Sequence, residues 1–514
     1  MLLGDMVDMA IRRHANELCF VDITQKKRFN FRQFGERIYR LANGLLSIGI
    51  KKGDRVAILQ GNCHQYLETL FAIFKVGAIA VPLNIRLSGQ EIAYQINDSE
   101  ANTLIIGESY LELLKSIKSD LKTVKFYICF EKPIEGMRYY EDLIKNNPAT
   151  NPEVDLREDD PFMIQYTSGT TGVPKGAVLT HKGAVSMAYD YMVHYGFYPR
   201  DKLLYVFPYF HVAVLIPITC FWGGGVNVTL RGFNPQEIAE VIQNEKINCC
   251  PLVPTMAYFL FSIPNIEKYD FSSIRGSVFG AFPLSETIAK KSMEIFPGGI
   301  AQSYGCAETT ATVLLYNETR EKIEAENYKT ITSCGKEMMG VQVRIVDDED
   351  VDVPVGEVGE IIVKGDRVMK EYWKRPRETA EALRGGWFHT GDLARMDEQG
   401  YVYIVDRKKD MIKTGGENVY PVEVENVIQS HPAVMFVGVI GTPDEKWGEV
   451  PMAVVQLKPG IKPSEELKKE IIEHCRARLA HYKAPKKVVF AETMPMTAAG
   501  KVLKRELRKI YSGK

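Results

Sequence analysis

The sequence predicts an α/β protein in which a large multi-layered N-terminal domain, with a β-rich subdomain, precedes a small mobile α+β C-terminal domain. Apolar strand-like runs alternate with amphipathic helical segments as far as about residue 300. After about residue 340 the pattern changes to short alternating strands separated by turn residues. The chain has 514 residues, more than one hydrophobic core usually organises, so at least two domains are expected.

The composition narrows the class of protein. Hydrophobic residues make up 45% of the chain, charged residues 25%, and the formal net charge is −1, which indicates a globular protein without the basic balance of a nucleic-acid binder. Nine cysteines are scattered without a Cys-x-x-Cys spacing, as is typical of free thiols in a reducing cytoplasm. The N-terminus lacks the features of a signal peptide, so a cytoplasmic location is expected. The oligomeric state stays open, a homodimer included.

The first strands are predicted from short apolar runs. These are residues 55–60, 103–106, 124–130, 202–207, 226–230, 251–253 and 277–279. Between the runs, helices have recognisable starts: Ser88 and Glu91 form a capping box, Pro235 follows Asn234 at a first helical turn, and Ser285 precedes a helix over 286–296.

The stretch 203–230 contains no Asp, Glu, Lys or Arg and is long enough to cross a bilayer. Pro208, His211, Pro217 and the glycines at 223–225 interrupt it. We therefore predict a strand, a loop, a buried helix and a second strand here, and no transmembrane segment.

The β-rich subdomain is predicted from strands over 341–346, 360–364 and 401–405. A charged segment, 406–410, follows with no apolar anchor, and we place the domain boundary there, giving domains 1–406 and 407–514. The C-terminal domain is expected to contain helices over 421–430 and 464–481 and strands over 434–440, 452–457 and 487–490.

The segment 166–176 has the composition of a phosphate-binding loop and follows a predicted buried strand. Its glycines let successive N–H groups converge on an anion, while hydroxyls and one lysine add donors. The expected ligand-binding residues are Thr167, Ser168, Gly169, Thr170, Thr171, Gly172 and Lys175. The segment does not fit a Walker A loop, because Pro174 stands five residues after Gly169 and Gly176 follows the lysine.

The segment 166–176 resembles the signature loop of the adenylate-forming superfamily, which includes acyl-CoA synthetases, peptide-synthetase adenylation domains and luciferases. Seven further segments resemble that family's motifs and occur in the family's order. They are 208–212, 280–284, 302–308, 387–392, 406–410, 413–418 and 495–501. Together they span nearly two thirds of the chain.

The resemblance assigns roles to residues around ATP and the acid. His211 is expected to border the acyl pocket and act as a gate for the substrate carboxylate. Glu308 is expected to hold Mg²⁺, since this hard cation is usually bound through one or two carboxylates. Asp392 is expected to accept both ribose hydroxyls, and Arg407 to reach ribose or phosphate. The residues expected around the adenine are Ala281, Phe282, Pro283, Gln302, Ser303, Tyr304 and Gly305.

Two positions depart from the family's pattern. Phe282 occupies a position that is usually small, and Ala307 stands where a threonine usually contacts the α-phosphate. The neighbouring Thr309, or a water molecule, is the expected substitute for the missing hydroxyl.

The resemblance also implies the C-terminal machinery. Lys409 is the expected pivot of a domain rotation, and Lys501 is expected to enter the active site on a mobile loop. The segment carrying Lys413, Gly415, Gly416 and Asn418 is expected to admit the pantetheine arm of coenzyme A close to the backbone.

These residues imply an acid–thiol ligase that uses ATP, Mg²⁺ and coenzyme A and passes through an acyl-adenylate. The alternatives are transfer to a carrier-protein thiol, a luciferase-like oxygenase, a phosphotransferase and a nucleotide sensor without catalysis. The absence of a side chain at Gly305 predicts an open pocket and therefore a medium- or long-chain fatty acid. Ser303 narrows a position that is often glycine, which keeps an aromatic or alicyclic acid as the second candidate.

Overall fold

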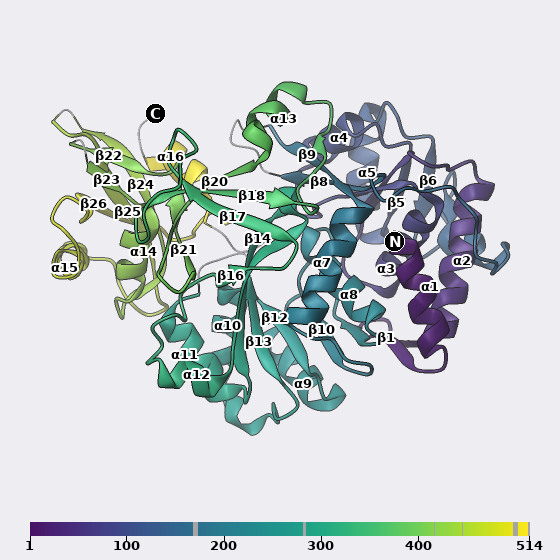
Figure 1. Ribbon diagram of the computed structural model, residues 1–514, viewed down its shortest axis with the longest axis horizontal. Coiled ribbons are helices and arrows are strands. Elements are labelled where there is room, and N and C mark those ends of the chain that lie inside the picture. The colour runs from purple at the N-terminus through teal and green to yellow at the C-terminus, as the bar shows by residue number, and fades with distance from the viewer. Residues whose placement is uncertain (168–172, 281–283, 416, 445, 497–501, 512–514) are drawn as a thin grey trace. The chain divides into compact units, whose positions relative to one another are not determined.

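The computed structural model describes residues 1–167, 173–280, 284–415, 417–444, 446–496 and 502–511. Contacts divide the chain into two compact units (Figure 1). The first comprises Met1–Ile331, Gly335–Val343 and Val363–Phe388, and the second comprises Thr332–Cys334, Arg344–Ile362 and His389–Lys514. The second unit thus takes residues from both sides of position 406, and the boundary predicted there stays a prediction.

A nine-stranded sheet forms one layer of the first unit within the described chain. Six neighbouring strands are parallel, and their apolar sequences are buried, as expected for strands covered on both faces. In spatial order the strands are β16 (Lys336–Glu337), β15 (Ala311–Glu318), β14 (Gly299–Cys306), β13 (Gly276–Gly280), β12 (Cys249–Leu252), β10 (Lys202–Tyr205), β11 (Val226–Thr229), β1 (Leu18–Asp22) and β2 (Lys27–Asn30).

An eight-stranded sheet of described residues forms a second layer of this unit. Its order is β19 (Glu371–Tyr372), β9 (Lys175–Thr180), β8 (Pro161–Thr167), β4 (Ile79–Pro82), β3 (Arg55–Leu59), β5 (Thr103–Ile106), β6 (Phe126–Cys129) and β7 (Arg138–Tyr139). Strand β8 is parallel to β4 and antiparallel to β9, so the segment after Thr167 returns beside its own strand.

Helices cover the sheets of the first unit. They are α1 (Leu3–His14), α2 (Phe31–Ser47), α3 (His64–Val76), α4 (Gly89–Asp98), α5 (Leu111–Ile117), α6 (Tyr140–Lys145), α7 (His181–His194), α8 (Leu215–Trp222), α9 (Pro235–Glu245), α10 (Pro254–Phe261), α11 (Glu286–Ile295), α12 (Arg320–Ala325) and α13 (Pro376–Ala382). Every residue of α3 is buried, because this helix contacts β4 in one sheet and β1 in the other.

The helix starts predicted from sequence are confirmed. The Ser88 Oγ accepts from the Glu91 N–H, and the Glu91 carboxylate accepts from the Ser88 N–H at 2.9 Å. Asn234 caps α9 with Pro235 in its first turn, and Ser285 caps α11. The apolar stretch 203–230 contains β10, α8 and β11, and none of the described helices is long and apolar enough to cross a membrane.

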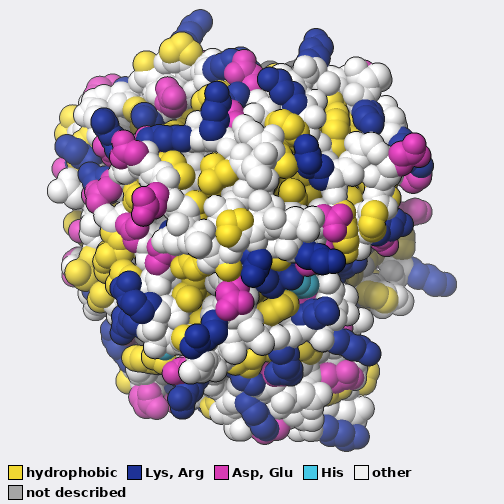
Figure 2. Space-filling model, turned by 90° about the vertical axis from the view of Figure 1, so that its right-hand side faces the viewer, with side chains coloured by type: hydrophobic (Ala, Val, Ile, Leu, Met, Phe, Trp, Pro, Cys, Tyr) yellow, Lys and Arg dark blue, Asp and Glu magenta, His cyan; other side chains and the backbone are white. Residues whose placement is uncertain are grey.

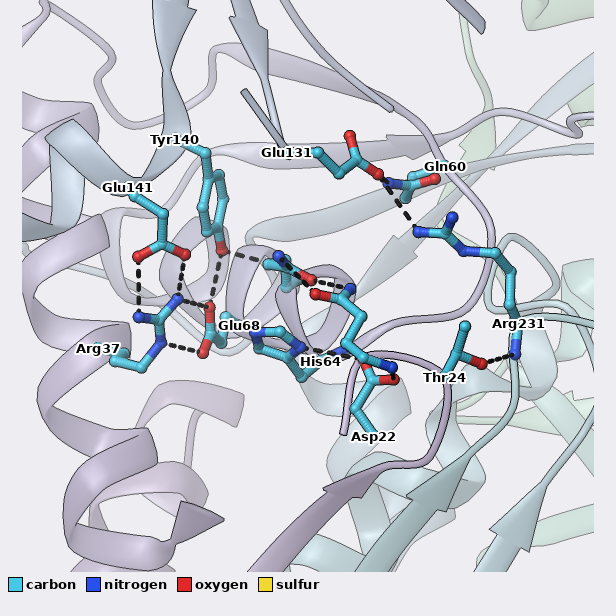
Figure 3. Close-up of polar contacts among 12 residues, drawn as sticks. Asp22, Thr24, Arg37, Gln60, His64, Glu68, Glu131, Tyr140, Glu141 and Arg231 are labelled. Carbon is cyan, nitrogen blue, oxygen red and sulfur yellow. Dashed lines mark hydrogen bonds and ion pairs between the residues drawn. The ribbon is translucent and has the colours of Figure 1, made fainter. Parts of the chain in front are cut away.

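A polar network joins α2, α3 and α6 inside the first unit (Figure 3). Glu68 is fully buried and accepts from Arg37 at 2.5 Å and 3.1 Å and from the Tyr140 hydroxyl at 3.1 Å. Arg37 also donates to Glu141 at 2.7 Å. Burying the Glu68 carboxylate is tolerated because both of its oxygens accept hydrogen bonds. On the face shown in Figure 2, cationic and anionic side chains are interspersed, in keeping with the near-zero net charge.

The β-rich region forms a four-stranded sheet among the described residues, in the order β17 (Val341–Val346), β18 (Gly359–Gly365), β20 (Phe388–Met396) and β21 (Val402–Arg407). Three of these strands were predicted within a few residues. Strand β20 was not, because residues 387–392 were interpreted only as a motif.

The C-terminal part folds around a five-stranded sheet, counted over its described residues. Strands β23 (Glu417–Val419), β22 (Ile412–Thr414), β25 (Gly448–Leu457) and β24 (Val434–Asp444) follow one another, and β26 (Lys487–Phe490) also pairs with β25. Helices α14 (Pro421–Gln429), α15 (Glu465–Arg476) and α16 (Lys504–Tyr511) complete it. The predicted helix over 464–481 ends earlier, at Arg476, because the chain then turns so that Leu479 packs against the core.

Candidate active site

Strands β8 and β9 bring the two ends of the predicted phosphate loop together. Thr167 and Lys175 are opposite each other in the antiparallel pair. Ser168, Gly169, Thr170, Thr171 and Gly172 lie outside the described residues. Gly176 lies in β9, where a Cβ atom would approach Ile164 to 2.5 Å. This glycine is therefore required by close packing within the sheet.

Glu308, the predicted metal-binding residue, lies in a short 3₁₀ helix (Ala307–Thr309) directly after β14. Its Oε1 accepts a hydrogen bond from the Tyr372 hydroxyl at 2.9 Å and one from Thr167 Oγ1 at 3.3 Å. The fold thus places the carboxylate at Thr167, the first of the expected phosphate-binding residues. A carboxylate beside an anion-binding loop suits a cation that bridges protein and phosphate.

The expectation that Thr309 replaces the hydroxyl missing at Ala307 is wrong. Thr309 is fully buried. Its Oγ1 accepts from the Cys306 N–H at 3.0 Å and lies 3.0 Å from the Ala311 carbonyl oxygen, to which it donates. This hydroxyl fixes the turn between β14 and β15 and does not face a ligand.

Strand β14 carries Gln302, Ser303, Tyr304 and Gly305. Gln302 is buried, Ser303 donates to the Phe279 carbonyl at 3.3 Å, and Tyr304 is half-buried. Ala281, Phe282 and Pro283, which were expected on the other side of the adenine, lie outside the described residues.

The prediction that Gly305 leaves an acyl pocket open is corrected by the fold. A Cβ atom on Gly305 would lie 1.7 Å from the Ala311 carbonyl oxygen and 2.9 Å from the Thr312 Cα. The glycine is needed because the backbone of β15 passes directly beside it at an irregularity in the β14–β15 register. A side chain at this position would therefore meet the protein's own backbone, although Gly305 itself is exposed.

His211 follows β10 and occupies the N-cap position of the short 3₁₀ helix Val212–Val214, without a capping hydrogen bond from its side chain. Its ring contacts Phe210 with centroids 4.6 Å apart. Within the described part of the chain, its buried Nε2 has no hydrogen-bond partner. Burial lowers the pKa of His211 to about 4, assisted by the Arg86 charge, so the imidazole is neutral near pH 7. A neutral ring with an unpaired nitrogen suits contact with a polar ligand group.

In the second unit, Asp392 and Arg407 are opposite each other on β20 and β21. The Arg407 Nε lies 2.7 Å from Asp392 Oδ1. Asp392 is 7% exposed, whereas the Arg407 side chain is 40% exposed. The structure therefore brings together Asp392, expected to bind the ribose hydroxyls, and Arg407, expected to reach ribose or phosphate.

Lys409, the expected pivot, is exposed in the turn after β21. The carboxylates on either side of it are held by later parts of the chain. Asp406 accepts from the Val422 N–H at 2.8 Å, and Asp410 pairs with Arg508 at 2.9 Å. Burial raises the pKa of Asp406 despite the nearby Lys504.

Strands β22 and β23 form the hairpin that contains the expected pantetheine segment. Lys413 and Asn418 are exposed cross-strand partners. Gly415 has a positive φ of 59°, and a Cβ atom there would lie 2.6 Å from the indole ring of Trp447. The group that approaches this glycine is thus a side chain of the same protein. Gly416 and Lys501 lie outside the described residues.

The sequence did not predict two residues that contact the candidate site residues. Tyr372, which bonds Glu308, lies on the two-residue strand β19, which is too short to produce a periodic pattern. Trp447 is 44% exposed and lies in a segment interpreted as a connection.

Comparison with known protein families gives two matches. Residues 7–373 match the model described as AMP-binding enzyme, and residues 423–501 match the AMP-binding enzyme C-terminal domain.

Similar proteins extend over nearly the whole chain. The long-chain-fatty-acid–CoA ligase FadD13 of Mycobacterium tuberculosis is 36% identical, over 96% of this chain and 95% of its own. The feruloyl-CoA synthase of an Amycolatopsis species is also 36% identical, over 94% of each chain. Among solved structures, the anthranilate CoA ligase AuaEII in complex with anthranoyl-AMP has a TM-score of 0.91 and 27% identity, covering 99% of this chain and 97% of its own.

Proposed function

Because this chain belongs to the AMP-binding enzyme family, we propose that it joins a carboxylic acid to the thiol of coenzyme A through an acyl-adenylate. The similar proteins support an acyl- or aryl-CoA ligase. The observation in the fold that carries the proposal is the contact of the Glu308 carboxylate with Thr167, the first of the expected phosphate-binding residues.

In the first half-reaction, a carboxylate oxygen of the acid attacks the α-phosphorus of ATP. The bond from this phosphorus to the oxygen that bridges it to the β-phosphate breaks, and pyrophosphate leaves. We assign the binding of the phosphates to Thr167, Lys175 and the segment between them. We assign to Lys501 a further positive charge that stabilises the phosphate oxygens during the attack. Glu308 would hold Mg²⁺, which would supply positive charge to the phosphate oxygens. Catalysis of this kind consists mainly of positioning and electrostatic stabilisation.

The nucleoside is assigned to two sets of residues. Tyr304 and its neighbours on β14 are proposed to contact the adenine. Asp392 is proposed to accept the ribose hydroxyls, since a carboxylate offers two acceptor oxygens to a vicinal diol. Arg407 supports this assignment, because its contact with Asp392 at 2.7 Å orients the carboxylate.

In the second half-reaction, the thiol of coenzyme A attacks the acyl carbon and AMP leaves. We propose that the C-terminal domain, 407–514, rotates about Lys409 between the two half-reactions. The hairpin with Lys413, Gly415, Gly416 and Asn418 is then proposed to guide the pantetheine arm. A hinge of a few residues at the end of an element is the common arrangement for such a rotation.

For the acid, we propose a medium- or long-chain fatty acid, with an aryl or alicyclic acid as the second candidate. The open-pocket argument from Gly305 no longer supports this choice. The remaining support is the apolar sequence of α8 and α10 and the similarity to FadD13, whose name specifies long-chain fatty acids. The second candidate is favoured by the similar feruloyl-CoA synthase and anthranilate CoA ligase.

A pyrophosphate-release assay over a panel of acids tests both parts of the proposal. We expect release with ATP, Mg²⁺ and octanoate to palmitate, and acyl-CoA with AMP once coenzyme A is added. Adjacent chain lengths should be poorly separated, since burying one methylene contributes only about 0.8 kcal/mol. Highest activity on ferulate, anthranilate or cyclohexane carboxylate would select the second candidate. Acyl transfer only to a carrier protein would exclude coenzyme A as the acceptor.

A further inference from the structure

Tyr372 connects two charged groups of the proposed active site. Its strand, β19, pairs with β9 so that Tyr372 lies opposite Ala177, two residues beyond Lys175. The phenolic hydroxyl donates to Glu308 Oε1 at 2.9 Å, and the Lys175 Nζ lies 5.1 Å from the centre of the phenol ring. One side chain thus contacts both the proposed Mg²⁺ carboxylate and the proposed phosphate lysine.

The backbone around Tyr372 is tied to the same two pieces of chain. The Met369 N–H donates to the Glu308 carbonyl at 2.7 Å, and the Trp373 N–H donates to the Gly176 carbonyl at 2.7 Å. Tyr372 is only 8% exposed. Its position is therefore fixed on both sides, and its hydroxyl and ring face have a defined direction.

The arrangement has an electrostatic consequence. Lys175 at the start of β9 and Glu308 directly after β14 carry opposite charges. Direct pairing would neutralise both and block their contacts with substrate. No ion pair joins them in the described structure, and each instead contacts Tyr372. A phenol suits this position because its hydroxyl donates to an anion while its ring face attracts a cation.

We propose that Tyr372 is a positioning residue that orients Glu308 toward Mg²⁺ and holds Lys175 apart from it, toward the phosphates of ATP. This inference rests on the proposed function of the site. It assigns Tyr372 an effect on Mg²⁺-dependent ATP binding that simple packing of the ring would not produce.

The test measures ATP binding by calorimetry over a range of Mg²⁺ concentrations, without acid or coenzyme A. Tyr372→Phe keeps the ring beside Lys175 and removes the hydroxyl. We expect the Mg²⁺ concentration for half-maximal binding to rise about tenfold, in line with the loss of a hydrogen bond to a charged group. Tyr372→Leu removes the ring as well. In EDTA, we expect Tyr372→Leu to bind ATP more weakly than wild type, and Tyr372→Phe to bind ATP as tightly as wild type.

Tyr39→Phe is the matched control, because the Tyr39 hydroxyl donates to the Asp8 carboxylate, also at 2.9 Å, in the same unit. Its Mg²⁺ dependence should match wild type. A second test combines Tyr372→Phe with Glu308→Gln, and the two effects should not add if Tyr372 acts through Glu308.

Three results would overturn the inference: an unchanged Mg²⁺ requirement in Tyr372→Phe, an equal change in Tyr39→Phe, or additive effects with Glu308→Gln. Failure of the wild type to bind ATP with Mg²⁺ would instead contradict the proposed function. Thermal melting of each variant distinguishes these outcomes from loss of folding. If Tyr372→Phe does not fold, Tyr372→His is measured in its place, because it retains an aromatic ring with an N–H donor.

Discussion

Ala307 leaves the proposed α-phosphate site without the hydroxyl that its family pattern supplies, and buried Thr309 does not replace it. We therefore predict that Ala307→Thr tightens ATP binding or accelerates adenylate formation, because a hydrogen bond to a charged acceptor contributes about 1.5–3 kcal/mol. Pyrophosphate exchange measures the effect. Ala307→Val is the control, since valine has the shape of threonine without its hydroxyl. An equal gain in both variants, or none in either, would contradict the assignment.

Two histidines with lowered pKa values predict loss of stability in acid. Burial lowers the pKa of both His181 and His211 to about 4, from an ordinary value of 6.5. As the pH falls, these histidines therefore bind protons in the unfolded chain before they do so in the folded protein. Their contribution to the free energy of unfolding is complete above pH 6.5 and declines towards pH 4. Thermal unfolding at pH 7, 6, 5 and 4 should show this decline.

His181→Asn isolates one of the two contributions. The asparagine oxygen replaces the His181 Nδ1, which accepts from the Leu3 N–H at 3.4 Å, but it does not titrate. We expect a shallower loss of melting temperature between pH 6.5 and 4 than in wild type. The same change at the exposed His481 should leave the slope unaltered. A slope identical in wild type and His181→Asn would show that other groups cause the acid sensitivity.

The β14–β15 pair determines what Gly305 does. Because a Cβ atom at this position would overlap the Ala311 carbonyl oxygen, Gly305→Ala is expected to lower the free energy of unfolding by about 1–3 kcal/mol. Adenylate formation should fall with every acid alike, since the strand carrying Tyr304 and leading to Glu308 is displaced. Chemical denaturation and the acid panel measure the two effects. A stable variant that changes only its preferred chain length would restore the open-pocket interpretation.

The turn between β21 and β22 is the proposed site of the domain rotation. Lys409→Pro should spare adenylate formation and impair thioester formation, because proline fixes φ near −65° where the rotation must change it. Proline also lacks the backbone N–H of Lys409. Among the backbone hydrogen bonds of the described chain, none is donated by this N–H, so its loss would not explain impaired thioester formation. Pyrophosphate exchange measures the first half-reaction, and acyl-CoA formation from supplied acyl-adenylate measures the second.

Lys501→Ala should have the opposite effect to Lys409→Pro on the two half-reactions. It should abolish pyrophosphate exchange and leave thioester formation from acyl-adenylate largely intact, since this lysine is assigned only to the first half-reaction. If both variants lose both half-reactions, or both keep them, the proposed division of the reaction between two conformations is wrong.

The order of motifs from 166 to 501 was sufficient to identify the family, and local patterns predicted many of the strands and the helix caps at Ser88, Asn234 and Ser285. These features depend on residues close together in sequence. The domain boundary at 406 and the roles of the predicted site residues stay predictions.

Only the tertiary structure decided which distant groups meet. It placed Tyr372 against Glu308 and Lys175, turned Thr309 inward, and put the backbone of β15 where a side chain of Gly305 would stand. Sequence patterns report the periodicity and turn chemistry of single elements. These contacts depend instead on the strand register of β14 and β15 and, for Tyr372, on pairing between segments far apart in the chain. For the same reason, a glycine looks alike in sequence whether it leaves space for a ligand or for its own neighbouring strand.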